Sequence, residues 1–131
     1  MSTLRVIDHP LVQHKMGLLR DKNTSTRDFR GLVRELSLLL GYEATRDLPL
    51  EPAAVETPMG PAQCRRLAGK KLVLAPILRA GLGLCDGLLE LVPSARVGHI
   101  GLYRDPVTHL PQEYYCKLPA DLDERPVLLL D

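Results

Sequence analysis

Three apolar segments of the sequence end in residues that can bind an anion. Arg79-Ala80-Gly81-Leu82-Gly83 follows Leu72–Leu78, Arg104-Asp105 follows Ala95–Tyr103, and Asp131 follows Pro126–Leu130. Glycine lets a backbone approach an anion closely, and the planar guanidinium of arginine fits phosphate oxygens. A carboxylate suits sugar hydroxyls, or a magnesium ion held through substrate phosphates. These residue types indicate a site for a phosphorylated sugar.

The apolar segments themselves are typical of strands in a buried parallel sheet. A helical pattern follows the first segment, with apolar residues at Leu84, Leu88, Leu89 and Val92. In open parallel sheets, ligands bind at the carboxyl ends of the strands. We therefore expect Arg79, Arg104 and Asp131 to meet at one edge, where the two arginines would share an anion. Spacing alone leaves the alternative open that each arginine is solvated or paired at the surface.

Upstream residues predict two helices and an arm. Asp8-His9-Pro10 indicates a helix start with a short polar cap, giving a helix over about 10–20. Ser25-x-x-Asp28 resembles a capping box and begins a helix over about 26–45. The expected buried stripe of that helix is Phe29, Leu32, Val33, Leu36, Leu39 and Leu40.

Prolines 49, 52, 58 and 61 exclude a helix over about 48–69, and Pro58-Met59-Gly60 predicts the turn of a protruding β-hairpin arm. Residues of about 70–131 form the sheet region, with Glu113–Leu118 as an extra edge strand. The fold class is therefore α/β, with residues 1–131 belonging to one domain.

Composition excludes several classes of protein. The net charge is +1, with one phenylalanine and no tryptophan, which argues against nucleic-acid binding. No apolar run reaches the ~20 residues of a membrane helix, and the amino terminus lacks a secretory pattern, so we expect a cytoplasmic protein. The cysteines, Cys64, Cys85 and Cys116, are expected to be free thiols.

No catalytic side chain or protein-held metal site is assigned. The histidines share no ligand spacing: they are His9, His14, His99 and His109. Gly81-x-Gly83 lacks the third glycine of a dinucleotide-binding loop, and no Walker-type lysine follows it.

Several motifs resemble the uracil phosphoribosyltransferase family over essentially the whole chain. They are Pro76–Gly83 with Asp86-Gly87 and Val92–Arg96, His9–Lys15, Tyr42–Leu48, Tyr103–Asp105 and Asp123–Arg125. The resemblance implies a type I phosphoribosyltransferase fold. It also implies transfer of ribose 5-phosphate from phosphoribosyl pyrophosphate to uracil, giving UMP and pyrophosphate in pyrimidine salvage. Magnesium bound mainly through the pyrophosphate, activation by GTP, and a homodimer or higher oligomer with the arm as a contact are further implications.

The resemblance also assigns roles to the strand-end residues. Arg79, Ala80 and Gly81 would hold the pyrophosphate, in a loop that often contains a non-proline cis peptide bond. Arg104 would bind the same donor, and Asp131 would face the ribose hydroxyls. The transition state would be oxocarbenium-like, so the protein would act by positioning and by neutralising the leaving pyrophosphate.

The 131 residues depart from the family pattern in one respect. They do not include the Thr-Gly-Gly loop that follows Asp131 in the family, or the later segment that recognises uracil. We therefore read the chain as the amino-terminal part of such an enzyme and expect negligible transferase activity from it alone. Two alternatives are a non-catalytic regulatory or assembly subunit, and a sugar-phosphate binding module of another class.

Overall fold

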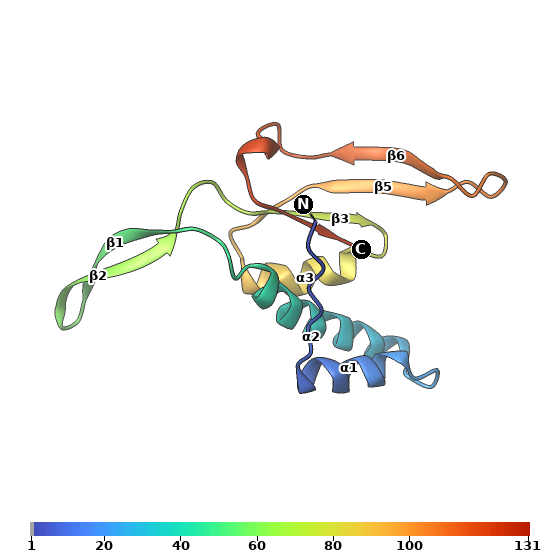
Figure 1. Ribbon diagram of the computed structural model, residues 1–131, viewed down its shortest axis with the longest axis horizontal. Coiled ribbons are helices and arrows are strands. Elements are labelled where there is room, and N and C mark those ends of the chain that lie inside the picture. Colours follow the sequence, from blue (N-terminus) through green and yellow to red (C-terminus); the bar gives the residue numbers. More distant parts are fainter. Residues whose placement is uncertain (1) are drawn as a thin grey trace.

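The computed structural model describes residues 2–131 as a mixed α/β structure, which confirms the expected fold class (Figure 1). The helical part and the arm come first, with α1 (Pro10–Arg20), α2 (Thr26–Ala44), β1 (Leu50–Thr57) and β2 (Gly60–Leu67). The sheet region contains β3 (Val73–Leu78), α3 (Leu82–Leu91), β4 (Arg96–Val97), β5 (His99–Arg104), β6 (Pro111–Lys117), a 3-10 turn η1 (Leu122–Glu124) and β7 (Val127–Leu130). No helix in residues 2–131 has the length and apolar character needed to cross a membrane.

The two helix starts differ in how well the sequence predicted them. The Ser25 hydroxyl accepts a hydrogen bond from the amide of Asp28 at 3.1 Å, which confirms the predicted start of α2. At α1 the cap is His9, whose Nδ1 accepts from the amide of Leu11 at 3.1 Å. The expected short cap, Asp8, instead accepts from the side chain of Gln13. An imidazole nitrogen therefore replaces the carboxylate as the capping acceptor.

The predicted apolar stripe of α2 is only partly buried. Phe29 remains 45% exposed and Leu40 38% exposed. The closest approach to α3 is made by small residues, because a Cβ on Gly87 would lie 1.7 Å from the Ser37 hydroxyl. A Cβ on Gly41 would similarly lie 2.1 Å from a leucine methyl of α3. The two helices therefore cross on small side chains, and periodicity of large apolar residues does not reveal such a contact.

β3 is the central strand of the sheet. Its residues Val73 and Leu74 pair in parallel with β4 on one side and with β7 on the other. β4 and β5 continue the same register along β3, so they are two parts of one strand. β6 pairs with β5 in the antiparallel direction. The strands therefore lie in the order β7, β3, β4/β5, β6, with β6 as the expected extra edge strand.

Pro76 explains why β4 and β5 are separate, where the sequence suggested one strand over 95–103. Leu74 accepts a hydrogen bond from the amide of Gly98 at 2.9 Å, so Leu74 faces β4/β5. Backbone groups alternate along a strand, and Pro76 therefore faces the same neighbour. Proline has no N–H to donate, so the ladder is interrupted opposite Gly98.

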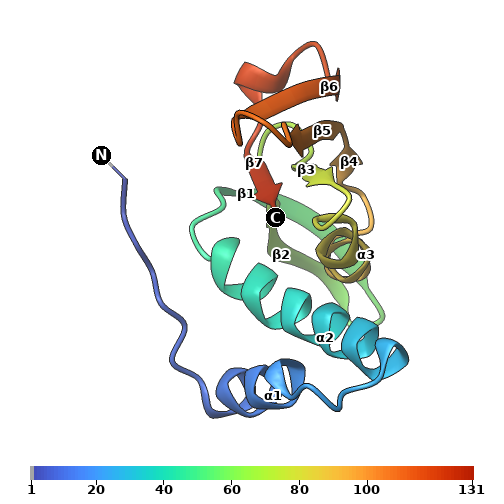
Figure 2. The ribbon, with the colours of Figure 1, turned by 90° about the vertical axis from the view of Figure 1, so that its right-hand side faces the viewer.

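The helices form layers on one side of the sheet, with α3 against the strands, α2 beyond it and α1 outermost (Figure 2). The core cluster joins β3, α3 and β7 and consists of Leu72, Leu74, Cys85, Leu88 and Leu130. The predicted arm is confirmed as the β1–β2 hairpin, which projects from the end of the sheet opposite the carboxyl ends of β3 and β7 (Figure 1). Its turn is Pro58-Met59, followed by Gly60 at φ 117°.

Candidate functional site

The loop between β3 and α3 contains the first group of predicted site residues. The peptide bond Leu78–Arg79 is cis, as the family resemblance implied for this loop. Arg79 and Ala80 are exposed, whereas Gly81 is buried at the start of α3. The Arg79 side chain forms no hydrogen bond or ion pair with residues 2–131. Its guanidinium donors are therefore available to a ligand.

Backbone bonds shape this loop and occupy part of the helix terminus. Gly81 donates to the carbonyl of Ile77 at 2.9 Å, and Leu82 donates to the carbonyl of Arg79 at 3.2 Å. Among the described residues, no side chain caps α3. Within residues 2–131, the amides of Arg79 and Ala80 donate to no backbone acceptor. The backbone N–H groups that remain open to a ligand therefore include those of the loop residues Arg79 and Ala80.

Gly81 brings the loop against the strand that ends at Asp131. A Cβ at this position would lie 2.2 Å from the carbonyl oxygen of Leu130 and 2.8 Å from the amide nitrogen of Ile77. Its φ of −63° and ψ of −15° are open to any residue, so space rather than backbone conformation requires glycine. Figure 1 shows the chain end of β7 beside this loop. The fold therefore places the backbone just before Asp131 against the loop, while Asp131 itself lines a separate pocket between β7, α2 and α3.

Arg104 ends the neighbouring strand but reaches further. Leu78 of β3 pairs with Gly101 of β5, and Arg104 lies three residues beyond Gly101. At ~3.3 Å per residue, Arg104 lies roughly 10 Å beyond the paired residues Leu78 and Gly101 along the strand direction. Arg104 does not line the groove in which Arg79 lies. It shares the carboxyl edge of the sheet, while the shared anion remains a prediction.

Asp105, the carboxylate beside Arg104, has a structural role. Its Oδ1 accepts hydrogen bonds from the amides of Val107 and Thr108, both at 2.8 Å. These bonds, with Thr108 contributing most, lower the pKa of Asp105. Asp105 therefore holds the β5–β6 turn that positions Arg104.

A groove of about 570 Å³ lies between α2 and the loop that begins α3. Arg79 and Ala80 line it from the loop, and Asp86 lines it from α3. Two arginines of α2, Arg30 and Arg34, line the opposite wall. Sequence analysis did not single out these α2 residues. Their spacing of four residues, which places them on one helix face, is the signal that could have revealed them.

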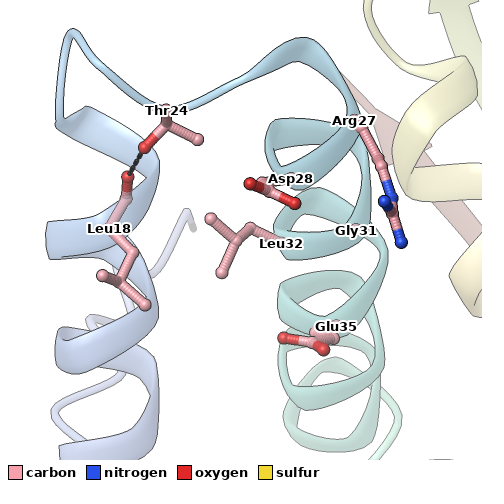
Figure 3. Close-up of a pocket in the computed structure, with 7 residues that line it drawn as sticks. All are labelled: Leu18, Thr24, Arg27, Asp28, Gly31, Leu32 and Glu35. Carbon is pink, nitrogen blue, oxygen red and sulfur yellow. Dashed lines mark hydrogen bonds between the residues drawn. The ribbon is translucent and has the colours of Figure 1, made fainter.

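A second groove, of about 430 Å³, lies between α1 and α2 and has a different character. Figure 3 shows Asp28, Leu32 and Glu35 projecting from α2 toward α1. The Thr24 hydroxyl donates to the carbonyl of Leu18 at 2.6 Å and fixes the connection between the helices. Arg27 and two carboxylates line this groove, so it offers a phosphate less positive charge than the groove of Arg79 does.

A third cavity, of about 400 Å³, lies at the base of the arm and is lined in part by Lys70 and Lys71. Lys70 donates to Asp121 at 2.9 Å, and Arg125 contacts the same carboxylate at 2.8 Å. Arg125, followed by Lys70, holds the pKa of Asp121 well below its usual range. This ion cluster lies at the amino end of β3, opposite the candidate site.

A magnesium ion that is bound mainly through substrate phosphates needs only one or two protein carboxylates. Residues 2–131 contain no group of three or more His, Cys, Asp or Glu side chains that could hold a metal. Single carboxylates near the loop, Asp131 and Asp86, can each supply one ligand beside phosphate oxygens. The other reactive side chain nearby is Cys85, whose pKa is raised by burial, which disfavours the nucleophilic thiolate.

A mainly parallel sheet with helices on one face, and an arginine–glycine loop at the carboxyl end of its central strand, defines an α/β domain of the type I phosphoribosyltransferase architecture. The sequence profile of the family described as uracil phosphoribosyltransferase matches residues 6–131. The chain belongs to this family, as the motifs had indicated.

Individual relatives agree with this assignment. The chain is 63% identical to the uracil phosphoribosyltransferase of Symbiobacterium thermophilum and 59% identical to that of Alkaliphilus metalliredigens, each over 131 residues. Each alignment includes 100% of this chain and 63% of the relative's length. A solved structure, the AQ2163 protein from Aquifex aeolicus, superimposes with a TM-score of 0.88 at 38% identity, over 95% of this chain and 60% of that one. The chain therefore spans about 63% of the length of the curated relatives.

Proposed function

We propose that the protein transfers ribose 5-phosphate from phosphoribosyl pyrophosphate to uracil, forming UMP and pyrophosphate in pyrimidine salvage. The observation that carries the proposal is the contact of Gly81 with Leu130, which joins the Arg79 loop to the strand that precedes Asp131. An anion-binding loop and the strand that ends in a carboxylate for sugar hydroxyls thus lie side by side. The three free cysteines support a reducing compartment, and we propose the cytoplasm.

Each residue of the site has a role in this proposal. Arg79 binds pyrophosphate oxygens through its guanidinium, and the amides of Arg79 and Ala80 donate to the same group. Asp131 accepts hydrogen bonds from the ribose hydroxyls. Arg104, further along the edge, binds another part of the extended donor. These groups hold the leaving pyrophosphate and offset its charge as the sugar becomes cationic.

Magnesium fits the same site as a partner of the substrate. When bound, it supplies positive charge to the pyrophosphate oxygens. Asp86 lines the Arg79 groove and Asp131 follows the strand that touches the loop, so each would supply one oxygen ligand.

A chimera tests the transferase activity. This chain would replace its matching segment in the Symbiobacterium thermophilum relative, to which it is 63% identical. We expect the chimera to form UMP from uracil and phosphoribosyl pyrophosphate, and Arg79→Gln to abolish most of that activity. A folded chimera that binds the donor without forming UMP would instead favour a non-catalytic subunit or a sugar-phosphate binding module.

Assembly and regulation belong to the same proposal. The arm exposes Leu50, Val55, Met59 and Leu67, and exposed apolar groups of this kind support a homodimer contact. The cavity at the arm base combines apolar walls with Lys71, which supports GTP as an activator. Sedimentation of the chimera with and without Met59→Asp, and UMP formation with and without GTP, test these two points.

A further inference from the structure

The groove between α2 and the Arg79 loop has uncompensated positive charge. Arg34 is paired with Glu90 at 2.7 Å, and this bond raises the pKa of Arg34. In contrast, neither Arg30 nor Arg79 forms an ion pair with any residue in 2–131. The remaining acidic group of the lining, Asp86, also has no such partner. Two free guanidinium groups therefore face one groove that contains one carboxylate.

Close helix packing holds these groups together. A Cβ on Gly83 would lie 3.1 Å from the Val33 side chain, so the first turn of α3 touches α2 at this point. Arg30 lies three residues before Val33, and side chains on a helix lean toward its amino terminus. Arg30 therefore lines the groove beside the contact, while the Arg34–Glu90 pair joins the two helices one turn further on.

The dimensions and chemistry of the groove suit a polyanion. Its volume of about 570 Å³ is within the ~300–1,000 Å³ range of small-molecule sites. A guanidinium offers two parallel donors to phosphate oxygens, and two guanidinium groups from different walls can bind two phosphate groups. Such an anion would neutralise charges that otherwise repel each other.

We propose that Arg30 of α2 is a second pyrophosphate-binding residue, which acts with Arg79 across this groove. The inference rests on the proposed function, because it assigns the pyrophosphate end of the donor to a particular wall of the site. Arg30 would bind the leaving group and help to neutralise it, in addition to the loop between β3 and α3.

The test compares Arg30→Gln, Arg30→Lys and Arg20→Gln in this chain, by calorimetric titration with inorganic pyrophosphate. Arg20 is a matched control, because it is helical, exposed and outside the groove, and it forms no ion pair with any residue in 2–131. We expect Arg30→Gln to weaken binding about tenfold, Arg30→Lys to recover part of the loss, and Arg20→Gln to change little. Circular dichroism would show whether the variants remain folded.

The same variants in the chimera separate this inference from the proposed function. We expect Arg30→Gln to raise the KM for phosphoribosyl pyrophosphate and to leave the KM for uracil unchanged. Unchanged pyrophosphate affinity and donor KM, in a chimera that forms UMP, would overturn the role of Arg30 alone. An equal loss from Arg20→Gln would also overturn it, because the effect would then be one of overall charge. A folded wild-type chimera that forms no UMP would overturn the proposed function, whereas pyrophosphate affinity still decides the role of Arg30.

Discussion

Replacing Gly81 with alanine adds one methyl group at the contact between the anion loop and β7. The new Cβ would lie 2.2 Å from the Leu130 carbonyl oxygen and 2.8 Å from the Ile77 amide nitrogen. A carbon–oxygen contact is ordinarily about 3.3 Å or more, so the loop and the strand must separate by roughly 1 Å. Both obstacles are backbone atoms, and neither can move away by a change of rotamer.

The expected cost of this overpacking is about 1–3 kcal/mol. For a chain of this size, that corresponds to a fall in melting temperature of roughly 3–12 °C. Gly17→Ala is the matched control, because, apart from its chain neighbours and the backbone of its own helix, no atom of residues 2–131 lies within 4 Å of a Cβ at that position of α1. Alanine is the better helix former, so the control should gain about 0.5–1 kcal/mol.

Thermal melts and urea titrations of the two variants measure both changes. Pyrophosphate titration adds a functional measurement, because the displaced loop carries Arg79. We expect Gly81→Ala to lose stability and pyrophosphate affinity together, and Gly17→Ala to lose neither. The steric reasoning would be refuted if Gly81→Ala melted at or above the wild-type temperature and bound pyrophosphate as before.

Three further results are expected. Gly87→Ala should lower the free energy of unfolding by about 1–3 kcal/mol. Ser37→Gly should restore only part of this loss, because the Arg34 carbonyl oxygen would remain 2.6 Å from the new Cβ. Complete restoration in a double-mutant cycle would contradict this reasoning. The lowered pKa of Asp121 stabilises the fold above its unfolded pKa of about 3.9, and this stability is lost as the pH falls through the folded pKa. The melting temperature should therefore fall more steeply with decreasing pH for the wild type than for Asp121→Asn. Parallel curves of melting temperature against pH would count against a stabilising role of the ion cluster. A thiol reagent should label the two exposed cysteines quickly and Cys85 only after unfolding, since Cys85 is 4% exposed and its pKa is raised; three equal rates would disprove this.

Local signals in the sequence predicted most elements of the fold. The Ser25 cap, the Pro58-Met59 turn and the apolar segment at β3 each act over a few residues, and each is confirmed. The interruption opposite Pro76 was missed because it depends on which neighbour that residue faces. The sequence alone does not contain this pairing.

The candidate site was predicted in part, for a similar reason. Strand ends brought the Arg79 loop and the strand before Asp131 together, since parallel strands end at one edge. Arg104 extends further, because β5 continues into its own hairpin with β6. Arg30 was missed because a charged residue on an amphipathic helix ordinarily faces solvent. Its position in a groove follows from the close crossing of α2 and α3, which small residues produce.

The hairpin arm pairs its two strands with each other and stands away from the sheet (Figure 1). Its turn residue Met59 is 97% exposed. Peptide insertions after Met59 would meet no packed neighbour among residues 2–131, so an epitope or a fluorescent label could be grafted there while the sheet and its anion loop keep their form. The same isolation would let homologous proteins diverge in arm length without repacking their interiors.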